Sequence, residues 1–284
     1  MALSEFQYTG EDFRLTQEMK DAYEENGFMI IKGLITPEEH KKLKEAVESS
    51  QALQKYSYGV GDGADRKMRM CLLKHPGNNV IGMVSRCEKV AGTAEQILGG
   101  EVYHYHSKVI MKDARTGGKF VWHQDYGYWY NNFIVFPDML SVLMPIDPSL
   151  KENGCLQVLV GSHKCGRINH GKIGGQTGAD LKRLEMVKTF CPHKYVELQP
   201  GDALFQHSNL LHTSEPNNSD MRRWMFIVAY NKASNNPVKQ HFLPSYTKLH
   251  KVKDSAILDC KNEDDLDDEL FVDPKVDFTI DLQA

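Results

Sequence analysis

Two residues with metal-binding side chains, His123 and Asp125, are separated by a single residue in the segment Phe120-Val-Trp-His-Gln-Asp-Tyr126. Two imidazoles and one carboxylate on one face of Fe(II) form a facial triad, which leaves coordination positions open for a cosubstrate and for O2. Residues two apart in an extended segment project to the same side. His123 and Asp125 could therefore bind one metal ion together, and a second histidine is needed to complete the set.

The best candidate for that histidine is His212, at the end of an apolar run that follows the turn-like Pro200-Gly-Asp202. His207, earlier on what we expect to be the same strand, is the serious alternative. At the start of the next apolar run lies Arg223, whose guanidinium could bind the far carboxylate of a dicarboxylate cosubstrate through two hydrogen bonds. Adjacent strand residues face opposite ways, so we expect Arg222 at the surface.

These residues belong to a larger set of motifs that spans most of residues 20–235. The set consists of Trp122-His123-Gln-Asp125, Glu152-Asn-Gly-Cys-Leu156, Gly161-Ser-His163, Pro200-Gly-Asp202, His212-x-Ser214 and Arg223. A His-x-Asp triplet alone would be a weak signal, but the combination is specific. With this combination the chain resembles the phytanoyl-CoA dioxygenase superfamily of Fe(II)- and 2-oxoglutarate-dependent oxygenases, and within it the branch that contains ectoine hydroxylase.

The resemblance implies a role for each residue that matches a family motif. It implies that His123, Asp125 and His212 bind Fe(II) and are the catalytic residues. It further implies that Arg223 binds the distal carboxylate of 2-oxoglutarate and that Ser214 is the hydroxyl partner of the same carboxylate.

At one position the chain departs from the family. Where the family often has an amide side chain, this chain has His106, in Tyr103-His-Tyr-His106-Ser-Lys108. His106 is a candidate contact to 2-oxoglutarate, and Lys108 is a weaker candidate. Related halogenases lack the iron-binding carboxylate, so the presence of Asp125 implies hydroxylation. The implied reaction uses O2 to hydroxylate an unactivated C–H bond and releases succinate and CO2 from 2-oxoglutarate.

Aromatic residues follow the metal motif directly, in Tyr126-Gly-Tyr128-Trp129-Tyr130. In ectoine hydroxylases, an aromatic side chain at about the place of Trp129 contacts a small zwitterionic substrate. Aromatic faces attract amines and quaternary ammonium groups by roughly 0.5–2 kcal/mol. We therefore predict Trp129, Tyr126 and Tyr128 as substrate contacts, with Trp129 first, although these rings could instead fill an interface between a loop and the barrel.

The substrate is expected to be a small amine, amino acid or betaine-like molecule. A fatty acyl-CoA or lipid is the alternative within the family, but the chain has no basic cluster suited to the phosphates of CoA. Two other classes of protein could keep the same barrel. A catalytically silent binding protein would have little reason to retain the triad together with Arg223, and a cupin-like metal protein would not bind 2-oxoglutarate.

The composition is that of an ordinary globular protein, with 284 residues, 41% hydrophobic residues and a formal net charge of -4. Basic residues are scattered, which argues against a nucleic-acid partner. The chain has no apolar stretch of the roughly 20 residues needed to span a membrane, and its start does not resemble a signal peptide. Its six cysteines form no Cys-x-x-Cys pair. We expect free thiols and a cytoplasmic protein; the sequence leaves the oligomeric state open.

Short strands punctuated by Gly, Pro and Asn predict a mainly β fold with flanking helices, built around a double-stranded β-helix (jelly-roll or cupin-like) core. We expect one domain over residues 1–284: helical support in 1–100, the β-helix core in 101–235, and a C-terminal extension with an acidic segment in 236–284. The predicted strands are 28–31, 102–112, 120–124, 139–146, 155–159, 194–198, 203–207 and 224–231.

Helices are predicted at 16–25, at 36–50, where Thr36-Pro37-Glu38-Glu39 provides an N-cap signal, at 80–98 and at 180–188. The glycine-containing segment 56–68 is expected to be a mobile loop. Residues 161–191 are expected to leave the barrel as a mobile lid rather than to bind phosphate, because no Gly-Lys-Ser/Thr follows the glycines. The acidic run 259–269 is expected to be a solvated tail.

Overall fold

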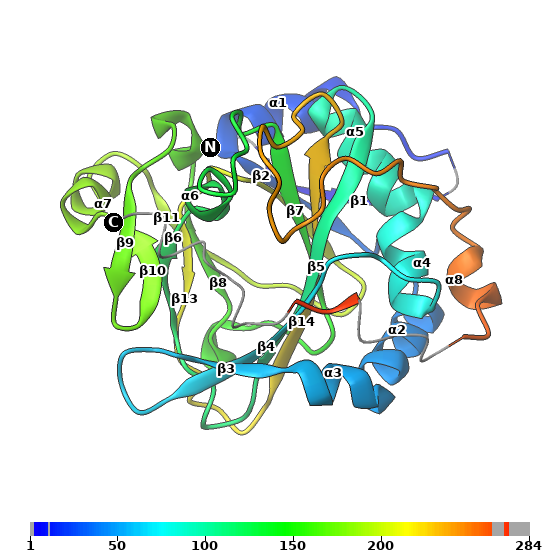
Figure 1. The fold of residues 1–284 in the computed structure, drawn as a ribbon, viewed down its shortest axis with the longest axis horizontal. Coiled ribbons are helices and arrows are strands. Elements are labelled where there is room, and N and C mark those ends of the chain that lie inside the picture. Colours follow the sequence, from blue (N-terminus) through cyan, green and yellow to red (C-terminus); the bar gives the residue numbers. More distant parts are fainter. Residues whose placement is uncertain (1–2, 11, 263–269, 273–284) are drawn as a thin grey trace.

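The fold was analysed in a computed structural model that describes residues 3–10, 12–262 and 270–272 (Figure 1). Its largest sheet has eight strands, in the spatial order β1 (Glu5–Gln7), β2 (Phe28–Lys32), β12 (Ala203–His207), β7 (Met139–Pro145), β14 (Arg223–Lys232), β5 (Val102–Lys112), β4 (Lys67–Leu73) and β3 (Tyr58–Gly61). A second sheet has the order β11 (His193–Val196), β8 (Leu156–Leu159), β13 (His212–Ser214) and β6 (Phe120–His123). A hairpin joins β9 (His170–Ile173) to β10 (Gln176–Ala179).

Most helices lie in the N-terminal part of the chain. They are α1 (Gln17–Asn26), α2 (Pro37–Ser49), α3 (Gln51–Tyr56), α4 (Val80–Arg86), a π-helical turn (Glu88–Gly92) and α5 (Thr93–Leu98). Later come α6 (Asp125–Trp129), α7 (Leu181–Lys188), α8 (Ala256–Asp259) and the 3-10 turns Lys151–Asn153 and Ser162–Cys165. In Figure 1, α2, α4, α5 and α8 lie together on one side of the molecule, and the β9–β10 hairpin and α7 lie on the opposite side.

Alternation along the strands of the large sheet divides the core in two. On β14, Phe226 and Val228 belong to the cluster that the sheet forms with the helices, whereas Met225 and Ile227 belong to the cluster shared with the four-stranded sheet. Because successive strand residues point to opposite faces, each long strand packs on both layers. Barrel-facing positions of β14 and β5 thereby become the wall of the space between the two sheets.

Several predicted elements are confirmed with their local causes. Helix α2 begins with a capping box, in which the Thr36 side chain accepts a hydrogen bond from Glu39 N and the Glu39 side chain accepts one from Thr36 N. Helix α1 ends at Gly27, whose φ of 80° lies in the left-handed region that favours glycine. The predicted strand 203–207 and the predicted strand 102–112 match β12 and β5.

Three predictions about elements are wrong. The segment 56–68 is not a loop, because β3 pairs with β4 and β4 pairs with the long strand β5. The helix expected over 80–98 breaks at Cys87, which is extended because it forms a β-bridge with Val252. His207 and His212 do not share a strand, since His207 ends β12 in the large sheet and His212 begins β13 in the small one.

The expected excursion 161–191 contains the β9–β10 hairpin and α7, the helix predicted at 180–188. Part of the acidic segment, residues 263–269, lies outside the described residues. None of the helices in the described part of the chain has the length and apolar character needed to cross a lipid bilayer.

Candidate metal centre and adjoining cavities

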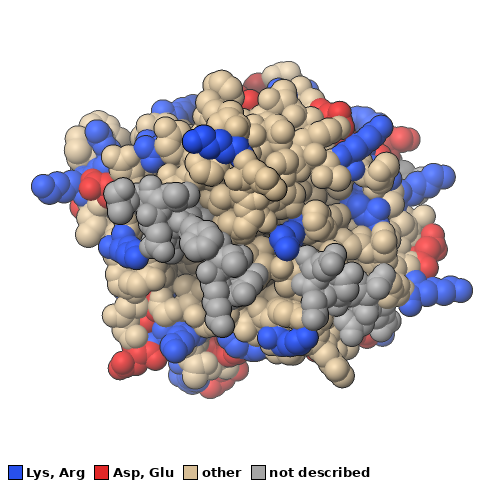
Figure 2. All heavy atoms as spheres, in the orientation of Figure 1, with Lys and Arg blue, Asp and Glu red and all other residues tan. Residues whose placement is uncertain are grey.

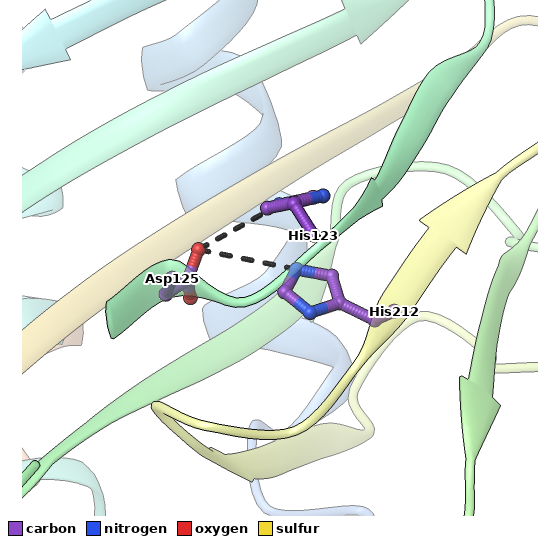
Figure 3. A group of neighbouring side chains, drawn as sticks. All are labelled: His123, Asp125 and His212. Atoms are coloured by element: carbon purple, nitrogen blue, oxygen red, sulfur yellow. Dashed lines mark ion pairs between the residues drawn. The ribbon is translucent and has the colours of Figure 1, made fainter. Parts of the chain in front are cut away.

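The three predicted metal ligands meet where the short strands β6 and β13 pair. His123 ends β6 and His212 begins β13, and these two residues are direct cross-strand partners. Asp125 opens α6 immediately after β6, so the turn of the chain, and not a continued strand, brings its carboxylate to the histidines. Figure 3 shows both imidazoles directed toward Asp125. Asp125 Oδ1 lies 3.8 Å from His123 Nε2 and 3.9 Å from His212 Nε2.

Hydrogen bonds fix the orientation of each ligand. His123 Nδ1 lies 2.8 Å from the carbonyl oxygen of Val121, and His212 Nδ1 lies 2.8 Å from that of Leu210. These contacts place the ring proton of each histidine on Nδ1 and leave the Nε2 lone pair for a cation. Asp125 accepts a hydrogen bond on its other oxygen, Oδ2, from Ser141 Oγ at 2.7 Å.

The protonation state of the three residues suits a divalent cation. Burial lowers the pKa of both His123 and His212, so both imidazoles are neutral at neutral pH. Burial alone would raise the pKa of Asp125, but Lys108, the two imidazoles and the Ser141 hydrogen bond together hold it below the ordinary value. Two neutral imidazoles and one carboxylate, with ligand atoms all within 4.8 Å of one another, match the donor set of a facial iron site.

Gln124, between the two motif residues, points away from the metal centre. Its amide nitrogen donates to the carbonyl oxygens of Gly166 and Asn209, and its amide oxygen accepts from Ile168 N at 2.7 Å. His170 Nε2 accepts from the backbone N–H of Gln124 at 2.8 Å. The segment after residue 161 therefore holds the turn between β6 and α6, which places Asp125.

A first cavity extends from the metal centre between the two sheets and reaches Arg223. Its polar lining includes Ser214, Thr213 and Gln206, and its apolar lining includes Ile110, Leu143, Leu156, Met225 and Ile227. Arg223 is the first residue of β14 and is buried, and in the described part of the chain it pairs with no carboxylate; its Nε has no hydrogen-bond partner there. Burial lowers the pKa of Arg223 to about 10, so the guanidinium stays charged at neutral pH.

Beside Arg223 lies a residue that the sequence reasoning missed, the fully buried Lys112. Lys112 is the cross-strand partner of Arg223, and its Nζ donates to Ser214 Oγ at 2.8 Å and to Glu215 O at 2.5 Å. Burial and then the charge of Arg223 lower the pKa of Lys112. Alternation along β5 could have found it, because His106, Lys108, Ile110 and Lys112 occupy every second position and so face one side.

A second cavity adjoins the first at the metal centre. Both cavities are lined by Lys108, Phe120, His123 and Asp125. The second continues past His106, Asn132 and the β10 residues Gln176 and Thr177 toward a wall that includes Tyr58, Tyr128, Phe242 and Leu243. His106 is buried next to Lys108, and its Nδ1 has no hydrogen-bond partner in the described part of the chain.

The three aromatic residues predicted as substrate contacts lie in different surroundings. Tyr128 lines the second cavity, and its hydroxyl donates to Thr177 O at 2.6 Å. Trp129 is buried against the rings of His106 and Tyr105, with centroids 5.7 and 5.6 Å away, and is not among the residues that line either cavity. Tyr126 is buried as well and donates to the carbonyl oxygen of Ile134. Trp129 thus packs against the ring of His106, which lines the second cavity, without lining that cavity itself.

The rival residues of the sequence lie away from the centre. Arg222 forms ion pairs with Asp147 and Glu48, on the other side of the strand from Arg223. His163 Nε2 lies 2.9 Å from the carbonyl oxygen of Glu24 and so ties its turn to α1. His207 packs beside His163, with the two rings tilted and their centroids 5.1 Å apart.

Comparison with known proteins agrees with this geometry. Residues 23–225 match the model of the family described as phytanoyl-CoA dioxygenase (PhyH). L-proline trans-4-hydroxylase from Streptomyces griseoviridis is 28% identical over 250 residues, which cover 80% of this chain and 92% of the relative. Ectoine dioxygenase from Streptomyces coelicolor is 25% identical over 239 residues, or 78% of this chain and 80% of the relative. The crystal structure of EctD from S. alaskensis with 2-oxoglutarate and 5-hydroxyectoine has a TM-score of 0.71 at 19% identity, covering 87% of this chain and 90% of that one.

The chain belongs to the phytanoyl-CoA dioxygenase family, because the family match covers more than half of its length. This membership confirms the resemblance seen in the sequence and, with it, the predicted class of enzyme, the Fe(II)- and 2-oxoglutarate-dependent dioxygenases. The similarity to EctD confirms the predicted double-stranded β-helix fold with flanking helices.

Proposed function

We propose that this enzyme hydroxylates an unactivated C–H bond of a small, amino-acid-like metabolite, with release of succinate and CO2. The observation that carries the proposal is a buried carboxylate-and-histidine triad that shares a cavity with the buried Arg223, which forms no ion pair with any described residue. A buried guanidinium without an anion is costly. An anionic molecule that extends from the triad to Arg223 removes this cost, and 2-oxoglutarate carries a carboxylate at each end.

In this proposal His123, Asp125 and His212 hold the iron, and Arg223 binds the distal carboxylate of 2-oxoglutarate. Ser214 is the hydroxyl partner of that carboxylate, and Lys112 fixes Ser214 through the 2.8 Å hydrogen bond to its Oγ. The bound iron supplies the oxidising chemistry by activating O2 at the expense of 2-oxoglutarate. The protein contributes the dry cavity and the fixed orientation of each group.

The substrate lies in the second cavity, which opens on the same metal centre. Its wall combines aromatic rings with a few polar groups, a lining suited to a small molecule. Two relatives are named for reactions on L-proline and ectoine, and both are small amino-acid-like molecules. Tyr128 and His106 contact the substrate in this account, while Trp129 and Tyr126 act by positioning the residues around them.

The location we propose is the cytoplasm. All six cysteines are free, and three of them, Cys71, Cys87 and Cys155, are buried. Free thiols of this kind persist in a reducing compartment. On the face shown in Figure 2, Lys and Arg side chains are scattered among acidic ones and do not merge into one patch.

Succinate release under air tests the proposal. The purified enzyme with Fe(II) and 2-oxoglutarate should show slow turnover alone and faster turnover when a panel of free amino acids, including L-proline, is added. A matched sample of Asp125→Ala should give neither. A binding protein without catalysis, or a cupin-like protein that uses another cosubstrate, would consume no 2-oxoglutarate, and that result would exclude the proposed function.

A further inference from the structure

Neither the metal ligands nor the proposed contacts to 2-oxoglutarate give a role to the charge of Lys108. Lys108 lies at the centre of β5, between His106 and Ile110 on the barrel-facing side, and it lines both cavities. Its side chain is 15% exposed. Within the described residues its one ion pair joins Nζ to Asp125 Oδ1 at 3.8 Å.

That partner oxygen is also the one nearest to both histidines. Asp125 Oδ1 faces His123 Nε2 at 3.8 Å and His212 Nε2 at 3.9 Å, whereas Oδ2 is engaged by Ser141. A cation shared by the three ligands therefore competes with Lys108 for the same oxygen. With a metal ion bound, the ammonium needs another anion, because a buried charge without a partner is destabilising.

The walls of the two cavities indicate where this anion comes from. In the first cavity, Arg223 already supplies a cation for the distal carboxylate of 2-oxoglutarate. The residues that line the second cavity include one lysine, Lys108, and one carboxylate, Asp125, which belongs to the triad. An anionic group of the substrate would thus meet Lys108, and among the described residues of this wall no carboxylate other than Asp125 would repel that group.

We infer that Lys108 binds a carboxylate of the substrate, and that the enzyme therefore selects free amino acids over their amides and esters. The inference rests on the proposed function and adds a specificity-determining residue to it. It also assigns Lys108 to the substrate, and not to 2-oxoglutarate as the sequence suggested. Anchoring one end of the substrate beside Asp125 fixes which carbon atom lies next to the metal. The aromatic faces of Phe120, Tyr128 and Phe242 then receive the rest of the molecule.

Paired probes test this inference. Succinate release is measured with free L-amino acids, including L-proline, and with the carboxamide of each acid that stimulates. In the parent enzyme, kcat/KM should be about 10–100-fold higher for the acid than for its amide, the range expected for loss of a charge-assisted hydrogen bond. In Lys108→Met, which keeps an unbranched side chain but removes its charge, the acid should lose this advantage and the amide should be nearly unaffected. Lys108→Arg should restore part of the discrimination.

The controls separate this inference from the proposed function. Lys119→Met, at an exposed position near the second cavity, should keep the acid-to-amide ratio of the parent. The KM for 2-oxoglutarate in substrate-free turnover is measured in Lys108→Met and in the parent, and thermal unfolding of both proteins shows whether the variant is folded.

Three results would overturn the assignment of Lys108. The first is stimulation of the parent enzyme by amides as strong as by acids. The second is a lack of stimulation of the parent enzyme by any free amino acid. The third is a rise in the KM for 2-oxoglutarate in Lys108→Met with an unchanged acid-to-amide ratio. If the parent enzyme turns over no 2-oxoglutarate, the proposed function itself fails, and the inference fails with it.

Discussion

At the scale of single residues, the site combines groups that sequence spacing reveals with groups that only the fold reveals. His123, Asp125, His212 and Arg223 could be predicted because each belongs to a motif with a characteristic spacing. Alternation along β5 could have placed Lys112 on the barrel-facing side, but its role follows from the strand register that puts it opposite Arg223. The same holds for Ser141, whose hydrogen bond to Asp125 joins residues from different elements.

The buried guanidinium gives a prediction at this scale. Arg223→Lys should raise the KM for 2-oxoglutarate by at least about 10-fold, since a lysine cannot form two parallel hydrogen bonds with a carboxylate. Initial rates of substrate-free succinate release over a range of 2-oxoglutarate concentrations measure this. Arg222→Lys is the matched control, because Arg222 pairs with Glu48 and Asp147 at the surface. Equal effects of the two substitutions would contradict the role of Arg223.

At the scale of elements, strands that carry long apolar alternation were predicted well, and segments whose structure depends on a distant partner were not. Strands β5 and β12 have the predicted ends because their patterns are local. The β3–β4 hairpin was predicted as a loop because its glycines are typical of loops. The pairing of these two strands depends on β5, which pairs with β4. Helix α6 was not predicted either, although it carries Asp125 and Tyr128 into the site.

One glutamine connects three of these elements beside the second cavity. Gln176 of β10 donates to Gly61 O of β3 at 2.8 Å and to Lys119 O at 2.9 Å, and it accepts from Val121 N of β6 at 3.0 Å. Gln176→Glu keeps the acceptor but places a carboxylate against two carbonyl oxygens. It should raise the KM for the substrate by about 10-fold, as expected for losing buried hydrogen bonds.

Gln51 is an exposed glutamine of α3, so Gln51→Glu is the control for the added charge in Gln176→Glu. The KM for 2-oxoglutarate should not change in either variant, because Gln176 does not line the first cavity. An unchanged substrate KM in Gln176→Glu would show that the contact between β10, β3 and β6 does not shape the second cavity.

At the scale of the whole molecule, the predicted architecture of a β-helix core with helices outside is confirmed by the similarity to EctD. One apolar cluster joins the large sheet to the helices, and another fills the space between the sheets. Alternation in the sequence could predict that both faces of the central strands are buried, but it could not predict which strands are neighbours. That residues 1–284 form a single domain stays a prediction.

Buried neutral histidines should make the whole fold sensitive to acid. Burial lowers the pKa of His104 to about 3. Between the ordinary histidine pKa of about 6.5 and that value, the unfolded chain binds a proton that the folded protein does not, so the free energy of unfolding falls as the pH falls. Within this window His104 lowers the free energy of unfolding by about 1.4 kcal/mol for each pH unit of acidification, and above the window it causes no pH dependence.

Urea unfolding at pH 7, 6, 5 and 4 measures this dependence. His104→Gln removes the titrating group, so its free energy of unfolding should fall less steeply with decreasing pH than that of the parent. His250→Gln, at an exposed position, should follow the parent. Parallel curves for the parent and His104→Gln would show that His104 does not contribute to the acid sensitivity.

The central claim is that His123, Asp125 and His212 hold iron while Arg223 holds the far end of 2-oxoglutarate. Anaerobic titration of the protein with Fe(II) and 2-oxoglutarate tests it most directly, because chelation of the metal by the cosubstrate gives a weak visible charge-transfer band. We predict that the band forms in the parent, vanishes in His212→Ala, and requires higher 2-oxoglutarate concentrations in Arg223→Ala. Absence of the band in the parent, its persistence in His212→Ala, or parent-like 2-oxoglutarate binding by Arg223→Ala would contradict the claim.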